Sequence, residues 1–378
     1  MSPQRRTLLG LVAALLALAG CDLPASFARQ PGAATDSVYI GVAAARVPTS
    51  EAYFRGVELA VARLNADRPG GARPFAVALP PDSQPTQVAV AAAFRDDPRV
   101  VAVVGHTGSA QTMEAAPVYA DLEEGGRRAL AAVSPTATNP AVTREGDWVF
   151  RVCPTDVDGA RALARFALDS ARARRVAVIY RNDLFGRGFT AAFSRELEAG
   201  GADVVERDPY LAGITDFRAY ATRASRRGVD ALVVAGGGSD AGEIIRALRA
   251  AGSQARVLGS DDLASLNEAA GRAEFRGTRF VTFYAPQRSE GEEAQKFLEA
   301  YRAKFDATPT HQAALAYDAG MVIGRAVLAV GADRRKVRDR IAGTGTESPP
   351  HAGVTGSIKF DPQGDVVDKP VFIGEVQP

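Results

Sequence analysis

The chain is poor in the residues on which metal sites and disulfide frameworks depend. Its 378 residues include 2 cysteines and 3 histidines. His106, His311 and His351 have no further His or Cys at the spacing of zinc ligands, so we expect no metal. If Cys21 is modified as argued below, only Cys153 remains and a monomer can form no disulfide. Stability must then come from buried apolar side chains.

An excess of charge of one sign is also missing. The formal net charge is +1, and removal of a leader containing Arg5 and Arg6 brings the mature chain to about −1. Such a balanced charge gives no electrostatic basis for binding nucleic acid. After the first twenty residues no segment holds 18 uninterrupted apolar residues, so no further membrane-spanning helix is expected.

Sequence signatures of catalysis are absent as well. There is no Gly-x-Ser-x-Gly elbow, and glycines 236–238 lack the Gly-Lys-Ser/Thr ending of a phosphate loop. A hydrolase of amides would need a nucleophile and a base near each other, and the sequence offers no convincing pair. We expect His106 to hold a turn and Cys153 to be a small buried hydrophobe. The chain is therefore not expected to be an enzyme, and no catalytic residue or cofactor is assigned.

The amino-terminal segment has the order of a secretory signal. Arg5 and Arg6 precede an apolar run at 8–19, which is too short to span a bilayer, and small residues lead to Cys21. Residues 18–21 (LAGC) resemble the lipobox of bacterial lipoproteins. That resemblance implies diacylglycerol on the Cys21 thiol, cleavage before it and acylation of the new amino terminus. The alternative is a soluble secreted protein in which Cys21 is an unmodified residue. The export route is also open, because residues 5–9 resemble a twin-arginine signal.

The segment after Cys21 indicates a tether. Residues 22–37 are rich in Pro, Ala, Gly and Ser, which is typical of a flexible linker. Asp22 follows the modified position, and in enteric bacteria Asp there favours retention in the inner membrane. We therefore expect a periplasmic protein anchored to the membrane, the inner one, through lipidated Cys21.

Strands and helices alternate through the rest of the chain. Apolar strands are expected at 38–42, 75–79, 100–104, 129–133, 176–180, 203–206, 231–235, 256–259, 278–283 and 358–360, with helices between most of them. The all-apolar segment at 100–104 is typical of a strand buried on both faces of a parallel sheet. Two such series predict an α/β fold with two lobes. Helices at 292–305 and 312–329 follow the second series, so they are candidates to return to the first lobe.

Three motifs resemble one known family. They are 103–106 (VVGH), 134–140 (SPTATNP) and 150–156 (FRVCPTD), with support from 178–180, 185–188, 215–217, 356–361 and 364–365. Their order and spacing resemble the type I periplasmic binding proteins that serve branched-chain amino acid ABC transporters, the leucine/isoleucine/valine-binding group. The resemblance covers residues 38 to 376.

The resemblance implies two Rossmann-like lobes joined by three crossovers, with a ligand cleft between them. The crossovers are expected near residues 153, 285 and 355. The implied division is a signal at 1–20, a lipidated tether at 21–37, a first lobe at 38–152 plus 285–355, and a second lobe at 153–284 plus 356–378. Polar turns at the carboxyl ends of parallel strands are where such sheets bind ligands, which agrees with this picture.

The resemblance also implies a site for the ligand's α-carboxylate. The positions are Ser109, Thr136, Ala137 and Thr138. A hydroxyl and backbone N–H groups at a helix amino terminus can hold an anion without a buried cation. The alternative for Ser109 and Thr138 is that they only cap helices or turns.

On the second lobe, Asp261 takes the place of the family's glutamate, which contacts the ligand's ammonium group. It is one methylene shorter, and with Asp262 it could instead cap the next helix. Phe185 stands where the family usually has a tyrosine, and Gly238 stands where the family often has an aromatic residue. Arg46, in an altered loop after the first strand, is a candidate extra anion contact or a solvated surface residue. These departures leave branched-chain specificity open and allow a roomier pocket or a more anionic ligand.

The expected function is capture of an amino acid or related small carboxylate by a monomer, and delivery to an inner-membrane ABC permease. The alternative is a sensor that presents its ligand to a receptor or signalling partner. No nucleic-acid partner is expected.

Overall fold

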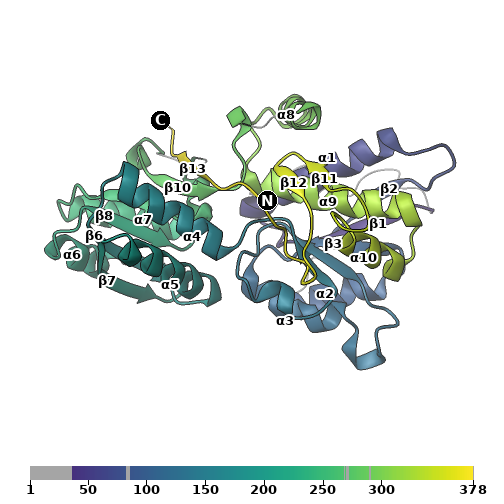
Figure 1. Cartoon of the computed structure of the whole chain (residues 1–378), viewed down its shortest axis with the longest axis horizontal. Coiled ribbons are helices and arrows are strands. Elements are labelled where there is room, and N and C mark those ends of the chain that lie inside the picture. Colours follow the sequence, from purple (N-terminus) through teal and green to yellow (C-terminus); the bar gives the residue numbers. More distant parts are fainter. Residues whose placement is uncertain (1–35, 82–85, 268, 270–271, 289–290, 378) are drawn as a thin grey trace, which may run out of the picture.

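The computed structural model consists of two α/β lobes, which lie side by side in Figure 1. It describes residues 36–81, 86–267, 269, 272–288 and 291–377. The signal, Cys21 and nearly all of the tether lie outside these residues. The predicted fold class, two lobes built on largely parallel sheets, is confirmed.

The first lobe is built on a five-stranded parallel sheet with the order β2-β1-β3-β4-β5. The strands are β1 (Val38–Ala43), β2 (Phe75–Ala78), β3 (Val100–Gly105), β4 (Ala131–Ser134) and β5 (Val149–Arg151). The helices are α1 (Glu51–Asp67), α2 (Gln87–Asp96), α3 (Ser109–Tyr119), α8 (Glu292–Phe305), α9 (His311–Val330) and α10 (Arg334–Ala342).

Helices cover both faces of this sheet, as the apolar strands require. Ile40 and Val42 pack in the cluster that contains residues of α1 and α9, whereas Val103 packs with α2 and α3 on the opposite face. The expectation that the late helices return to the first lobe is confirmed, because α9 packs along α1. Helix α9 is long and apolar enough to cross a membrane, but 78% of its most apolar window is buried in the structure. Helix α9 is therefore a core helix of the first lobe.

The second lobe is built on a six-stranded sheet with the order β13-β10-β9-β8-β6-β7, in which only β13 is antiparallel. The strands are β6 (Arg175–Arg181), β7 (Asp203–Tyr210), β8 (Ala231–Ala235), β9 (Arg256–Gly259), β10 (Arg279–Thr282) and β13 (Phe372–Glu375). The helices are α4 (Asp156–Arg165), α5 (Leu184–Ala199), α6 (Arg218–Arg226) and α7 (Gly238–Ala250), with a 3-10 segment at Asp261–Asn267. Val178 and Val233 face α4 and α5, while Ile179 and Val234 face α6 and α7, which is the two-residue period of strands buried on both sides.

The chain crosses between the lobes after β5, after β10 and before β13 (Figure 1). The third crossover differs from the position near 355 that we expected. The short strands β11 (His351–Gly353) and β12 (Gly356–Ile358) pair with each other. Phe360 packs against Phe150 of β5, with ring centroids 5.4 Å apart, and its N–H donates to the Thr344 carbonyl of the first lobe. Asp365 lies beside Arg151 at the edge of the first sheet, and the Arg151 N–H donates to the Gly364 carbonyl. The third passage therefore lies between Asp365 and Phe372.

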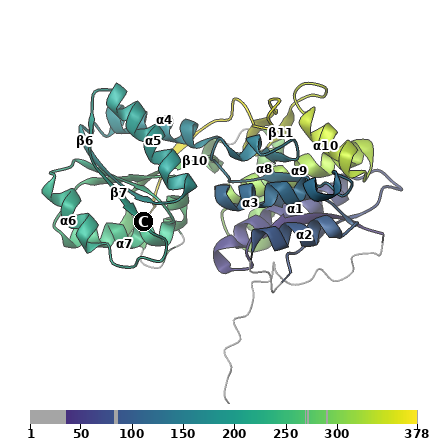
Figure 2. The ribbon, with the colours of Figure 1, turned by 90° about the horizontal axis from the view of Figure 1, so that it is seen from below.

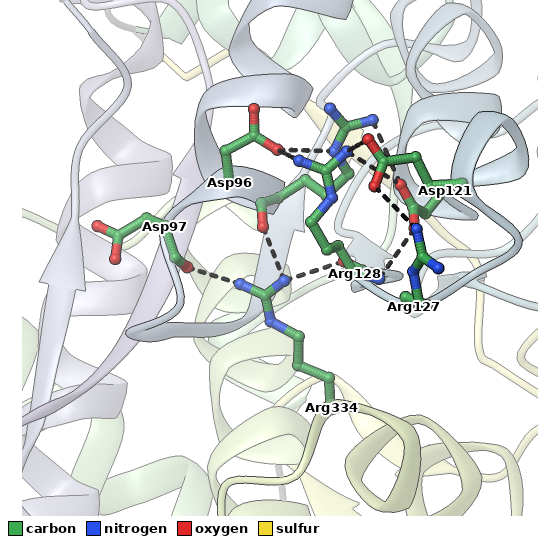
Figure 3. A network of polar contacts seen from close by, with 8 residues as sticks. Asp96, Asp97, Asp121, Arg127, Arg128 and Arg334 are labelled. Atoms are coloured by element: carbon green, nitrogen blue, oxygen red, sulfur yellow. Dashed lines mark hydrogen bonds and ion pairs between the residues drawn. The ribbon is translucent and has the colours of Figure 1, made fainter.

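A polar network fixes the end of the first lobe away from the strand carboxyl ends (Figure 3). Arg334, at the start of α10, donates to the carbonyls of Arg95, Asp97, Val100 and Arg128 at 2.6–2.9 Å. One guanidinium thus satisfies the carbonyls that end α2 and begin β3, since a helix leaves its last carbonyls without internal partners. Figure 2 shows this part of the lobe at the far side from the second lobe.

Candidate ligand-binding cleft

A cleft of about 240 Å³ lies between the lobes, where the carboxyl ends of β3, β4, β6 and β9 meet. This is the edge of open α/β sheets at which ligands bind. First-lobe residues on its wall are Tyr53, Thr107, Gly108, Ser109, Ala110, Gln111, Thr136 and Thr138. Second-lobe residues are Arg181, Asp183, Leu184, Phe185, Asp261 and Asp262.

The first-lobe wall contains the amino terminus of α3. Gly108 precedes the helix and provides no side-chain cap. Ser109 is 5% exposed, and its Oγ accepts from the Asn139 N–H at 3.2 Å, which leaves its O–H as a donor. The first N–H groups of a helix carry a partial positive charge, so this wall favours an anion.

The turn after β4 adds hydroxyls to the same wall. The Thr136 hydroxyl donates to the Thr107 carbonyl at 2.7 Å and lies 3.0 Å from the Tyr53 hydroxyl. Tyr53 is a cleft residue that the sequence did not suggest, because it lies on α1, away from the motifs. Thr138 is 3% exposed and also lines the cleft.

Ala137, in contrast, does not line the cleft. Its N–H donates to Ser134 Oγ at 3.1 Å, and its carbonyl accepts from Arg151 Nη1 at 3.3 Å. Both backbone groups are therefore used within the protein, and the structure gives no support to a direct ligand contact from this residue. Ala137 instead helps to hold the turn that presents Thr136 and Thr138.

The second-lobe wall is acidic. Asp261 is 5% exposed, and its pKa is raised, first by burial and then by the neighbouring charges of Asp262 and Asp156. Burial also raises the pKa of Asp262 to about 6 and that of Asp156, behind Thr138, to about 7. Among the described residues, the only ion-pair partner of Asp261 is His311, with 3.8 Å between Nε2 and Oδ2. Burial lowers the pKa of His311 to about 4, so this neighbour is neutral at pH 7.

Arg181 is the single cation on the cleft wall in the described part of the chain. It ends β6, and its Nε donates to Asp183, the residue that caps α5. Sequence reasoning missed it, because an arginine at a strand end belongs to no motif and resembles a solvated residue. Only the sheet order, which places β6 two strands from β9, brings it near Asp262.

The other predicted residues separate into two groups. Phe185 lines the cleft from the first turn of α5. Gly238 does not; a Cβ there would lie 1.8 Å from Ser265 Oγ, so that space is already filled by the 3-10 segment. Arg46 lies half-buried after β1 and is not part of the cleft wall.

The two residues that were considered in the search for catalytic groups, His106 and Cys153, are buried and have structural roles. His106 is fully buried, with Nδ1 2.7 Å from Gln87 Oε1 and Nε2 2.8 Å from the Tyr119 hydroxyl, and burial lowers its pKa to about 3. Cys153 lies in the main apolar cluster, and burial raises its pKa to about 12, which keeps it as a thiol. Both predictions are confirmed. Within the described residues no group of three His, Cys, Asp or Glu side chains is placed to hold a metal.

The two walls together can hold a small zwitterion. One presents helix N–H groups and hydroxyls, and the other presents buried carboxylates, so a molecule with an anionic and a cationic end would contact both lobes. Two α/β lobes around such a cleft define a two-lobed solute-binding protein. A family model described as "Periplasmic binding protein" matches residues 41–378, and the chain belongs to this family of binding proteins, which are not enzymes.

Named relatives agree with this assignment. An amino acid binding protein of Pseudomonas aeruginosa is 30% identical over 260 residues, which are 66% of this chain and 68% of that protein. The Leu/Ile/Val/Thr-binding protein of Salmonella typhimurium is 31% identical over 219 residues, 57% of this chain and 58% of its own length. The crystal structure of a leucine binding protein from Thermotoga maritima has a TM-score of 0.79 and 28% identity, and the match covers 90% of this chain and 95% of that one.

Proposed function

We propose that this protein captures an amino acid or a closely related zwitterion and delivers it to an ABC permease. The observation that carries the proposal is the opposite polarity of the cleft walls. Ser109, Thr138 and the amino terminus of α3 suit an α-carboxylate. Among the described residues Asp261 has no charged partner, and an α-ammonium group would supply one. The names of the relatives support an amino acid as the ligand and transport as the role.

Capture by two lobes changes their arrangement, and a permease can distinguish the closed, liganded arrangement from the open one. A ligand that contacts both walls stabilises the closed arrangement, because its affinity for that arrangement exceeds its affinity for separated lobes. The lobes already touch at one edge of the cleft, where Asn139 Nδ2 donates to the Leu184 carbonyl at 3.3 Å. Gly188 lies at the same edge, and a Cβ there would be 3.0 Å from Asn139 Nδ2 and 3.2 Å from Asp156 Oδ2.

A matched ligand series tests the binding proposal. Thermal unfolding should be measured with each amino acid, with its α-hydroxy acid, which lacks the amine, and with its amine, which lacks the carboxylate. At about 100 times the dissociation constant, the zwitterion should raise the free energy of unfolding by about 2.7 kcal/mol. Equal stabilisation by the hydroxy acid would contradict the ammonium contact, and no stabilisation by any amino acid would contradict the function.

Ligand affinity should increase as the pH rises from about 5 to about 7. Burial raises the pKa of Asp262 to about 6, so at the lower pH this carboxyl is largely neutral and cannot balance an ammonium group; the pKa of Asp261 is raised in the same direction. The ligand keeps its own charges over most of this range. Stability of the unliganded protein should change in the opposite direction, since the native state holds protons on these groups that the unfolded chain releases. Calorimetry in buffers of different ionisation enthalpy should detect proton release on binding; uptake would contradict the assignment.

Membrane attachment through Cys21 is a further part of the proposal. The first-lobe sheet begins at Val38, so the tether of 22–37 would separate the anchor from the folded lobes. Several acyl chains anchor stably, whereas one holds only marginally. Replacing Cys21 by Ala should move the protein from the membrane fraction to the soluble extracytoplasmic fraction. Cys153→Ala is the matched control and should leave the distribution unchanged; loss of anchoring in that variant alone would contradict the role of Cys21.

A further inference from the structure

Arg181 has an unused pair of donor atoms at the ligand cleft. Its Nε is taken by Asp183, but in the described part of the chain no acceptor is in hydrogen-bonding geometry with Nη1 or Nη2. The side chain is 29% exposed and lines the cleft. The ion pair with Asp183 holds the guanidinium plane, so its two terminal nitrogens form a fixed fork. Such a fork matches two acceptor lone pairs on one planar group.

An aliphatic side chain against this wall would leave the fork without a partner. Burial of polar donors that lose water and gain no acceptor is unfavourable, by more than the mean value of one hydrogen bond. On closure, a ligand whose distal end is a methyl or methylene group would impose this cost. A ligand with a planar acceptor at that end would remove it.

The charge around Arg181 distinguishes between the two common planar acceptors. Asp183 pairs with it directly, the charge of Asp262 acts on it, and Asp240 accepts from Tyr210 nearby. A ligand carboxylate would add a further negative charge to this group of aspartates. A carboxamide adds none, and its NH2 group can donate to the aspartates while its oxygen accepts from Arg181.

We infer that the natural ligand is an amino acid with a carboxamide at the end of its side chain, recognised by the Arg181 fork together with the neighbouring aspartates. The inference rests on the proposed function, since it takes the α-carboxylate at α3 and the α-ammonium at Asp261 as given. It makes Arg181 a specificity-determining residue, and it excludes a branched aliphatic side chain as the preferred ligand.

The test compares ligands of nearly equal size. Dissociation constants of asparagine, aspartate and leucine, and of glutamine, glutamate and methionine, should be measured by calorimetry on the wild-type chain. One of the amides should bind at least about tenfold more tightly than the acid and the apolar amino acid of its set. Tighter binding of leucine or methionine overturns the inference and leaves the proposed function in place. Tighter binding of aspartate or glutamate than of the corresponding amide overturns the inference that the side chain ends in a carboxamide. Absence of binding by every amino acid overturns the proposed function itself.

Arg181→Met gives the second measurement. It should lower the affinity for the amide by about tenfold to a hundredfold, and that for leucine or methionine by less than about threefold. The ratio of the two affinities is the readout, because a general loss of folded protein lowers both equally. Arg181→Lys should recover only part of the ratio, since an ammonium group lacks the planar fork. Arg187→Met, at an exposed arginine of α5, is the control and should change neither affinity. An unchanged ratio in Arg181→Met overturns the inference.

Discussion

Replacing Asp261 by Asn should lower the affinity for an amino-acid ligand by about 2–5 kcal/mol, the range for removing one charge of a buried hydrogen-bonded pair. Asn keeps the volume and one acceptor oxygen, so the change isolates the charge. The same substitution should stabilise the unliganded protein, because it removes a carboxylate that is 5% exposed and whose only ion-pair partner among the described residues is the neutral His311. Opposite changes in affinity and in unliganded stability are the signature of a carboxylate whose partner is the ligand.

Calorimetry and thermal unfolding of the same samples measure both quantities. Asp203→Asn is the matched control, since Asp203 is an exposed carboxylate at the start of β7. It should change neither quantity. If Asp261→Asn binds the amino acid as tightly as the wild type, Asp261 is only the first residue of its 3-10 segment and the ammonium contact lies elsewhere.

Arg151→Met should destabilise the fold by about 3–5 kcal/mol, as is found when one member of a buried ion pair is removed. Arg151 is fully buried, and its Nη2 lies 2.7 Å from Asp365 Oδ1. Its Nη1 also donates to the carbonyls of Ala137 and Asn139, at 3.3 and 2.6 Å. The substitution therefore removes the cation beside a half-buried carboxylate, which keeps the Thr143 hydroxyl as a donor, and removes an arginine donor from two turn carbonyls. Because that turn carries Thr136 and Thr138, ligand affinity should fall as well.

Denaturant unfolding of a double-mutant cycle with Asp365→Asn measures the coupling. The double variant should be less destabilised than the sum of the single changes, since removal of both charges leaves none uncompensated. Strict additivity would show that Arg151 acts through its carbonyl contacts alone. A loss below about 1 kcal/mol in Arg151→Met would show that neither contact matters to the fold.

Periodicity predicted the elements of the fold because each is formed by neighbouring residues. The all-apolar segment before Gly105 is typical of a strand buried on both faces of a parallel sheet, and β3 is such a strand. The position near 355 for the third crossover, which the family resemblance implied, was wrong because Phe360 still packs against Phe150 of the first lobe. The pairing of Arg151 with Asp365 joins residues far apart in the chain, and no local pattern marks it.

The residues predicted for the site also divide into those that lie in the cleft and those that do not. Ser109, Thr136, Thr138, Phe185 and Asp261 were predicted from motifs that resemble a family, and all five line one cleft. Their roles in binding remain predictions. Gly238 and Arg46 were assigned by position in those motifs and lie off the cleft wall, because a motif gives a place in the chain and no direction for a side chain.

The sequence by itself determined the low cysteine content, the resemblance of residues 18–21 to a lipobox, the alternating strands and the order of the family motifs, since these depend on residue type and short spacing. Only the tertiary structure decided which charges share the cleft. Arg181 ends β6, whereas Asp261 and Asp262 both follow β9, so their meeting depends on the order of strands in the second sheet. Burial then raises the pKa values of the two aspartates, while Arg181 keeps its charge beside them. The polar character of the cleft, and with it the kind of ligand it favours, follows from that packing.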